Sequence, residues 1–135
     1  MSITNRIQGI DPMGWTILNT ALSVSADSMA CDGGVITATL TVTGTTDDRK
    51  EVNSYTASIR DDYVIPDILW KSGPHRVEPN TKVNESFTVE LRCDKKCKVV
   101  GPDGSSGERT AELYAYVLGG ELEAATDEVP VTCVR

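Results

Sequence analysis

The stretch VITATLTVT, residues 35–43, decides the fold class. Apolar residues occupy the even positions from Ile36 to Val42, and threonines occupy the odd positions from Thr37 to Thr43. A period of two with β-branched residues is typical of a strand that buries one face, whereas a helix would scatter the same residues around its circumference. The stretch therefore predicts a β-strand with one face in a core.

The same alternation recurs in ESFTVELRC and RTAELYAYVLG, and weaker versions fill the chain between them. Clusters of Gly, Pro, Asn and Asp separate these runs, as turns require. Pro66 and Pro130 place their strands at a sheet edge or a bulge, because proline cannot donate to a ladder. No segment has a convincing helical period. The predicted strands are residues 22–30, 35–43, 52–60, 64–71, 84–92, 109–118 and 121–133.

The chain has 135 residues, which suits one domain with a real core. We expect the domain to comprise residues 21–135 and residues 1–20 to form an N-terminal arm. The arm carries regularly placed apolar residues, so we expect it to pack on something rather than to hang free. The apolar positions expected to make that contact are Ile3, Ile7, Ile10 and Trp15.

About seven strands with frequent turns resemble an immunoglobulin-like sandwich over residues 21–135. The resemblance rests on strand rhythm. Strands 35–43 and 109–118 carry no cysteine, whereas an antibody domain bridges its sheets with a cysteine pair beside a buried tryptophan. The nearer likeness is to the immunoglobulin-like modules of bacterial, archaeal and viral surface proteins. It implies an all-β fold, a single antiparallel sandwich with a surface role.

Four cysteines fall at one end of such a sandwich if its strands run alternately up and down. Cys31 follows the first strand, Cys93 and Cys97 follow the fifth, and Cys133 ends the last. We expect two disulfides, with Cys31–Cys133 and Cys93–Cys97 as the preferred pairing, because the first and last strands are parallel neighbours in these folds. A four-cysteine zinc site and a redox-active pair stay open as alternatives.

The formal charge of −7 argues against a nucleic-acid binder, which needs a basic footprint, and against binding to an anionic membrane surface. No apolar run approaches the roughly 18 residues of a membrane span. Within this acidic chain, Arg92, Lys95, Lys96 and Lys98 form a local basic patch. Such charge asymmetry favours head-to-tail contacts between copies, so we expect the patch and the loop 95–108 to be an interaction surface.

Nothing in the chain predicts catalysis or a cofactor. The single histidine, His75, has no G-x-S-x-G serine to serve, and we expect it to be an exposed loop residue. Two acidic pairs, Asp47-Asp48 and Asp61-Asp62, are candidate calcium ligands, although their spacing matches no EF-hand. Asn84-Glu85-Ser86 has the form of a glycosylation sequon.

These observations predict a non-enzymatic structural or adhesive subunit that self-associates through the N-terminal arm. Its disulfides place it outside the cell, on a cell surface, in an extracellular filament or on a virion. The alternative is a secreted monomeric binding module, either an inhibitor or a carbohydrate-binding domain. An exposed cluster of Trp70, Tyr55 and Tyr63 would favour the carbohydrate ligand. A hydrolase that uses the loop carboxylates is a third class.

Overall fold

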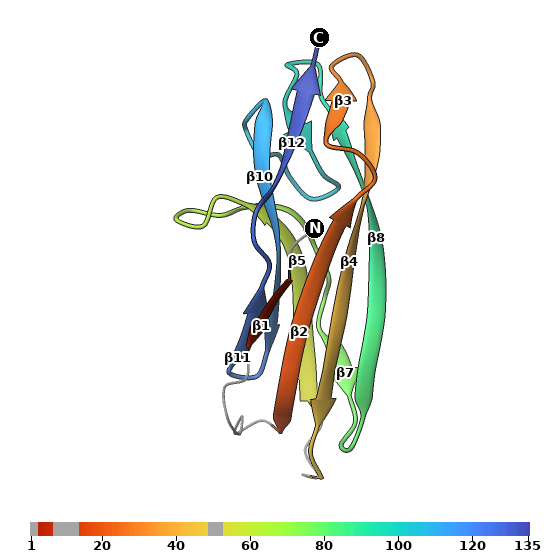
Figure 1. The fold of residues 1–135 in the computed structure, drawn as a ribbon, viewed down its shortest axis with the longest axis vertical. Helices are drawn as coiled ribbons and strands as arrows, with labels where there is room; N and C mark the ends of the chain where they lie inside the picture. Colours follow the sequence, from red (N-terminus) through yellow and green to blue (C-terminus); the bar gives the residue numbers. More distant parts are fainter. Residues whose placement is uncertain (1–2, 7–13, 49–52) are drawn as a thin grey trace.

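The computed structural model describes residues 3–6, 14–48 and 53–135, and these residues form a β-sandwich without a helix (Figure 1). The prediction of an all-β sandwich is confirmed. The strands are β1 (Ile3–Arg6), β2 (Trp15–Val24), β3 (Ser28–Ala30), β4 (Val35–Thr46), β5 (Asn53–Asp61), β6 (Asp67–Lys71), β7 (His75–Val77), β8 (Lys82–Cys93), β9 (Val99–Val100), β10 (Thr110–Gly119), β11 (Leu122–Ala125) and β12 (Val129–Val134).

Two sheets face each other. One sheet, here called sheet A, has the order β1-β2-β4-β8-β9. The other, sheet B, has the order β3-β12-β10-β5-β6, with β11 on β10 and β7 on β5. Strands β2, β4 and β8 thus lie in one layer, and strands β12, β10 and β5 lie in the other. The predicted strand 22–30 is divided between the two sheets. Its first part ends β2 in sheet A, and its last part is β3, which runs parallel to β12 in sheet B.

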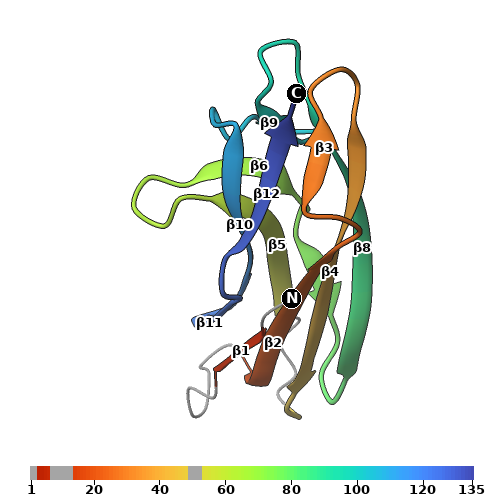
Figure 2. The ribbon, with the colours of Figure 1, turned by 45° about the horizontal axis from the view of Figure 1, so that its top comes forward.

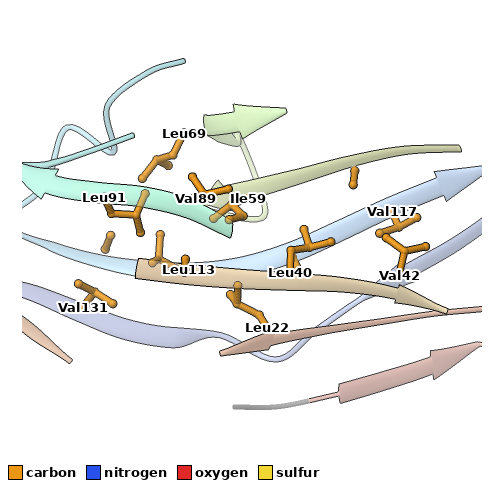
Figure 3. Close-up of a cluster of buried hydrophobic side chains, with 14 of the residues drawn as sticks. Leu22, Leu40, Val42, Ile59, Leu69, Val89, Leu91, Leu113, Val117 and Val131 are labelled. Carbon is orange, nitrogen blue, oxygen red and sulfur yellow. The ribbon is translucent and has the colours of Figure 1, made fainter. Parts of the chain in front are cut away.

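The alternation in β4 has the predicted consequence. Ile36, Ala38, Leu40 and Val42 are buried, while the threonines between them lie half-buried on the outer face. Strand β4 pairs with β8 on one side and with β2 on the other, so its apolar face lies at the centre of sheet A. Figure 3 shows Leu40 and Val42 in the core with Ile59, Leu113 and Val117 of sheet B.

The predicted boundary between residues 20 and 21 was wrong, because it falls inside β2. Trp15, Leu18 and Leu22 are completely buried in the sandwich core. The indole Nε1 of Trp15 donates to the carbonyl of Ser54 at 3.2 Å, which joins β2 to the opposite sheet. The domain therefore includes the chain from Trp15 onward, and of the expected arm only β1 lies on the periphery of the described structure.

Several strands differ from their predicted limits for identifiable reasons. The predicted strand 64–71 begins only at Asp67, because residues 62–66 form a projecting loop. The predicted strand 121–133 is two strands, β11 and β12, and both pair with β10. The short strands β7 and β9 were not predicted, since two or three residues carry no measurable period.

Candidate functional site

All four cysteines meet at one end of the sandwich, as predicted, and all four form disulfides. The preferred pairing was wrong: the disulfides are Cys31–Cys97 and Cys93–Cys133, with Cα–Cα distances of 4.8 and 5.9 Å. In the described ranges, no group of three or more His, Cys, Asp or Glu residues is placed to hold a metal ion. The disulfide interpretation is therefore the one confirmed.

The register between β3 and β12 explains the pairing. These strands are parallel neighbours, as expected, but Cys133 lies opposite Met29 rather than Cys31. Cys133 is completely buried and faces the interior, where Cys93 of the opposite sheet meets it. Cys31 lies beyond the end of β3 and donates its backbone N–H to Val134. The bridge Cys93–Cys133 therefore joins the sheets, and Cys31–Cys97 joins two turns.

A concavity of about 610 Å³ surrounds these disulfides, and we call it the pole concavity. Its lining consists of Cys31, Asp32, Gly33, Arg92, Cys93, Asp94, Lys95, Cys97 and Arg135. Three of these side chains are cationic and two are anionic. The Asp94 carboxylate is already engaged, because its Oδ1 accepts from the backbone N–H groups of Lys96 and Lys98 at 2.9 and 3.0 Å. Three cationic side chains against two carboxylates leave the lining with a formal side-chain charge of about +1.

The predicted basic patch surrounds this concavity only in part. Arg92 and Lys95 line it, whereas Lys96 is exposed beside it and Lys98 is half-buried. The tight turn that presents them depends on Cys97, which has a left-handed backbone with φ of 63°. Since that conformation is unfavourable for a residue with a Cβ, the disulfide to Cys31 and the Asp94 bonds help to hold it.

The rest of the predicted interaction loop, residues 99–108, packs on the sandwich. The backbone N–H of Asp103 donates to Leu69, and the Asp103 carboxylate accepts from the backbone N–H of Lys71 at 2.8 Å. Gly101 lies against the Leu69 backbone so closely that a Cβ would clash with it. Ser106 is buried. This segment is a cover over β6 rather than a free loop.

A different loop, residues 62–66 between β5 and β6, projects from the side of the sandwich (Figures 1 and 2). Its tip is aliphatic: Val64 is 87% exposed and Ile65 is 76% exposed. Both residues were predicted to belong to an edge strand, so sequence reasoning missed this feature. Adjacent β-branched residues favour a strand locally, and only the flanking Asp62, Pro66 and Asp67 signal a turn.

The acidic pairs do not form one site. Asp47 follows β4, near the start of β5, whereas Asp61 ends β5, so the length of that strand separates the two pairs. Asp61 is buried and accepts a backbone hydrogen bond from Glu112 at 2.9 Å. Burial is the main cause that raises the pKa of the Asp61 carboxyl, and the nearby charges of Asp67 and Asp62 add to it. The calcium prediction finds no support in the described residues.

The aromatic residues form an internal row rather than an exposed platform. Tyr55 is buried and packs edge-to-face on Trp15 and flat against His75, at ring distances of 6.2 and 5.1 Å. His75 also contacts Phe87, which contacts Trp70. The prediction of an exposed His75 was therefore wrong, since it lies half-buried in β7. Burial, followed by the neighbouring Glu85, raises the pKa of the Tyr55 hydroxyl.

The exposed aromatic cluster that would favour a carbohydrate ligand is not formed, because its three members pack against different neighbours. Tyr55 is in the core, Trp70 packs half-buried on Phe87, and Tyr63 stacks on Tyr114. The expected arm contacts also divide. Trp15 is wrong as an interaction residue because it is buried, whereas Ile3 lies in β1, and Ile7 and Ile10 lie outside the described residues.

Comparisons with known proteins give little further information. No family model matches the chain, and no curated protein matches it. Among solved structures it is similar to a b-glucosidase, EmGH1, from Erythrobacter marinus, with 16% identity and a TM-score of 0.35. The match covers 87% of this chain and 15% of the glucosidase chain. The described residues also contain no helix long and apolar enough to cross a membrane.

Proposed function

We propose that the protein is a non-enzymatic structural or adhesive subunit that self-associates by exchange of its first strand. In this assembly, β1 of one copy pairs with β2 of the next and completes its sheet A. The observation that carries the proposal is the position of β1: it is a four-residue strand at the edge of sheet A, paired with β2 from Ile3↔Ala21 to Arg6↔Leu18.

The outer edge of β2 can pair equally well with β1 of its own chain or with β1 of a neighbouring copy. Without β1, the outer edge of β2 would present unpaired N–H and C=O groups, which are a template for another strand. An identical β1 from a neighbouring copy offers the same hydrogen bonds in the same register. Exchange therefore costs no ladder hydrogen bond in the assembled state.

The donated segment has a sharp limit. Trp15 and Leu18 are core residues, so the chain from Trp15 onward must stay with its own sandwich. Gly14 directly precedes them and has φ of 93°, a conformation that glycine adopts without strain. The expected arm of residues 1–20 is thus narrowed to the chain before Gly14.

The other long free edge of sheet A is protected against such pairing. β9 pairs only with Arg92 and Cys93 of β8, which leaves the rest of that strand without a partner on its outer side among the described residues. Glu85 lies on the same side of β8 as the buried Val83 and Val89, yet it is exposed. An inward-directed charge on an edge strand disfavours pairing with another sheet. Strand addition is therefore favoured at β2 and disfavoured at β8.

Two disulfides are consistent with an oxidising environment, such as the outside of a cell. We propose an extracellular filament, a cell surface or a virion as the site of assembly. The second candidate function is a secreted monomeric binding module, and the exposed tip of the loop 62–66 is the observation that favours it. A protein ligand suits that tip better than a glycan, since Val64 and Ile65 are aliphatic.

Cysteine cross-linking between separate copies tests the strand exchange. One variant carries Ile3→Cys, and a ¹⁵N-labelled second variant carries Ala21→Cys; the two positions are directly opposed in the β1–β2 register. After mixing and oxidation, the proposal expects a disulfide-linked heterodimer of intermediate mass. The double variant in one chain is the matched control for local pairing. Exclusive intrachain bonding in the double variant, with no mixed-label dimer, would refute the exchange.

A further inference from the structure

The loop 62–66 exposes apolar side chains that do not stabilise the isolated domain. Val64 and Ile65 contribute no burial to the core, and their exposure leaves aliphatic groups in water. The adjacent Tyr63 is also half-exposed. A contiguous exposed tip of this kind marks a contact surface rather than a requirement of folding.

The loop is held in one conformation before any partner arrives. The Tyr63 hydroxyl donates to the carbonyl of Thr126 at 2.7 Å, and its ring stacks on Tyr114 at 4.0 Å. The Tyr114 hydroxyl donates to the carbonyl of Asp62 at 3.2 Å. The Asp62 carboxylate accepts the backbone N–H of Val64 at 3.0 Å. A pre-organised loop loses little conformational entropy on binding, which raises the affinity of a fitting partner.

The charges beside the tip define the partner. Asp62 and Asp67 lie exposed on either side of the aliphatic residues, so the loop presents an apolar point between two carboxylates. The surface beneath the loop is also acidic: Asp61, Asp62, Tyr63, Val64, Glu108, Thr110, Glu112 and Glu128 line a second concavity of about 450 Å³. Its described lining contains no Lys, Arg or His. An anionic lipid surface would be repelled, and a concave site with a cationic rim would be attracted.

The chain itself contains such a site. The pole concavity is lined by the cations Arg92, Lys95 and Arg135, by the carboxylates Asp32 and Asp94, and by three of the disulfide-bonded cysteines. Its volume of about 610 Å³ lies within the range of roughly 300–1,000 Å³ that binding pockets have. The loop projects and is acidic with an apolar tip, and the concavity has cysteines in its lining and more cationic than anionic side chains. Shape and charge are therefore complementary.

We propose that the loop 62–66 of one copy docks into the pole concavity of a second copy. The loop projects from the side of the sandwich, whereas the disulfides lie at its end with the β3–β4 turn and the C-terminus (Figure 2). The two surfaces are different, so the contact is heterologous, and it leaves a free loop and a free concavity at the two ends of any assembly that does not close into a ring. This contact rests on the proposed self-association only in taking a second copy as partner, because it uses neither β1 nor β2.

Charge exchange between the two surfaces tests the docking in the full-length protein. The loop variant carries Asp62→Asn and Asp67→Lys; Asn keeps the acceptor and tolerates the left-handed backbone of residue 62, whose φ is 70°. The pole variant carries Arg92→Glu and Lys95→Glu at exposed positions. A control with the same change in net charge as the loop variant carries Asp48→Asn and Glu78→Lys, both exposed and outside the two surfaces.

Sedimentation velocity over a concentration series at about 0.15 M salt gives the readout. The wild type and the charge control associate, and each reversed variant associates at least about tenfold more weakly. An equimolar mixture of the two reversed variants regains association, because the cationic loop then meets the anionic concavity and the native loop meets the native concavity. Val64→Ser/Ile65→Ser also weakens association, whereas Leu118→Ser, another exposed aliphatic position, does not.

Three results would overturn the docking: a wild type that is monomeric at every concentration, reversed variants that associate as the wild type does, or a mixture that stays monomeric. The cross-linking test distinguishes a failure of the docking from a failure of the strand exchange. Mixed-label dimers with no effect of charge reversal would leave the strand exchange and remove the docking. Charge-dependent association without mixed-label dimers would support the docking and reject the strand exchange.

Discussion

Removal of the bridge between the sheets is the sharpest test of the cysteine connectivity. Cys93 and Cys133 are 40 residues apart in sequence. The chain-entropy relation assigns about 3.9 kcal/mol to a loop of that size. The Cys31–Cys97 bridge spans 66 residues, and the same relation gives about 4.3 kcal/mol. We therefore expect Cys93→Ala/Cys133→Ala and Cys31→Ala/Cys97→Ala to lose similar free energies of unfolding.

The sequence provides a direct assay for the pairing itself. Lys95 and Lys96 separate the two nearby cysteines, so trypsin cuts between Cys93 and Cys97 without reduction. From the Cys93–Cys133 disulfide we expect the peptide 93–95 to be linked to the peptide 110–135. From the Cys31–Cys97 disulfide we expect the peptide 97–98 to be linked to the peptide that contains Cys31. Mass spectrometry of the unreduced digest identifies each pair.

Two results would contradict this reasoning. A digest fragment that links Cys93 to Cys97 would establish the pairing expected from sequence and reject the inter-sheet bridge. Urea denaturation supplies the energetic half of the test, through the midpoint and the slope of the transition. If Cys93→Ala/Cys133→Ala loses less than about 1 kcal/mol, the loop-closure account of this bridge fails.

Three further outcomes follow from packing and charge. Leu40→Ala should cost about 2–5 kcal/mol in urea denaturation because Leu40 is completely buried, whereas Thr39→Ala, on the outer face, should cost less than about 1 kcal/mol; equal costs would contradict the assigned strand faces. Gly101→Ala should cost about 1–3 kcal/mol through its clash with backbone, and Gly73→Ala, which has open space, should stay within about 0.5 kcal/mol. The raised pKa of Asp61 means that the native state holds its proton more tightly, so its contribution to stability falls as the pH rises above its ordinary value of 3.8. Asp61→Asn should therefore gain stability relative to the wild type as the pH rises above 3.8, and a difference that does not depend on pH would refute this cause.

The strands that bury one face were predictable because their periodicity is local. Val35 to Val42 fixes both the element and the face that it buries, and residues 84–92 and 109–118 behave in the same way. The gathering of the cysteines at one end followed from counting chain reversals. Both inferences need only the order of residues along the chain and the rule that neighbouring strands reverse direction.

The disulfide pairing and the fate of the N-terminal residues needed information that no local pattern carries. Cys133 lies opposite Met29, two residues before Cys31, so the choice of its partner depends on the register between β3 and β12 and on the opposite sheet, which brings Cys93 to Cys133. Trp15 was assigned to the arm of residues 1–20, since the first strand was predicted only from residue 22. Its burial depends on the indole reaching across to Ser54 of the other sheet, a contact 39 residues away in sequence.

The loop 62–66 shows why a surface site can look like a strand in sequence. Val64 and Ile65 have the β-branched side chains that favour extended structure. Three long-range contacts of Tyr63 and Tyr114, to Thr126, to Asp62 and between their rings, instead hold the segment away from the sheet. Loss of these contacts would free the tip to collapse onto the sandwich or to move. The tyrosines, rather than the aliphatic residues, therefore determine that the tip is presented at all, and they do so from positions that no local pattern in the loop connects to it.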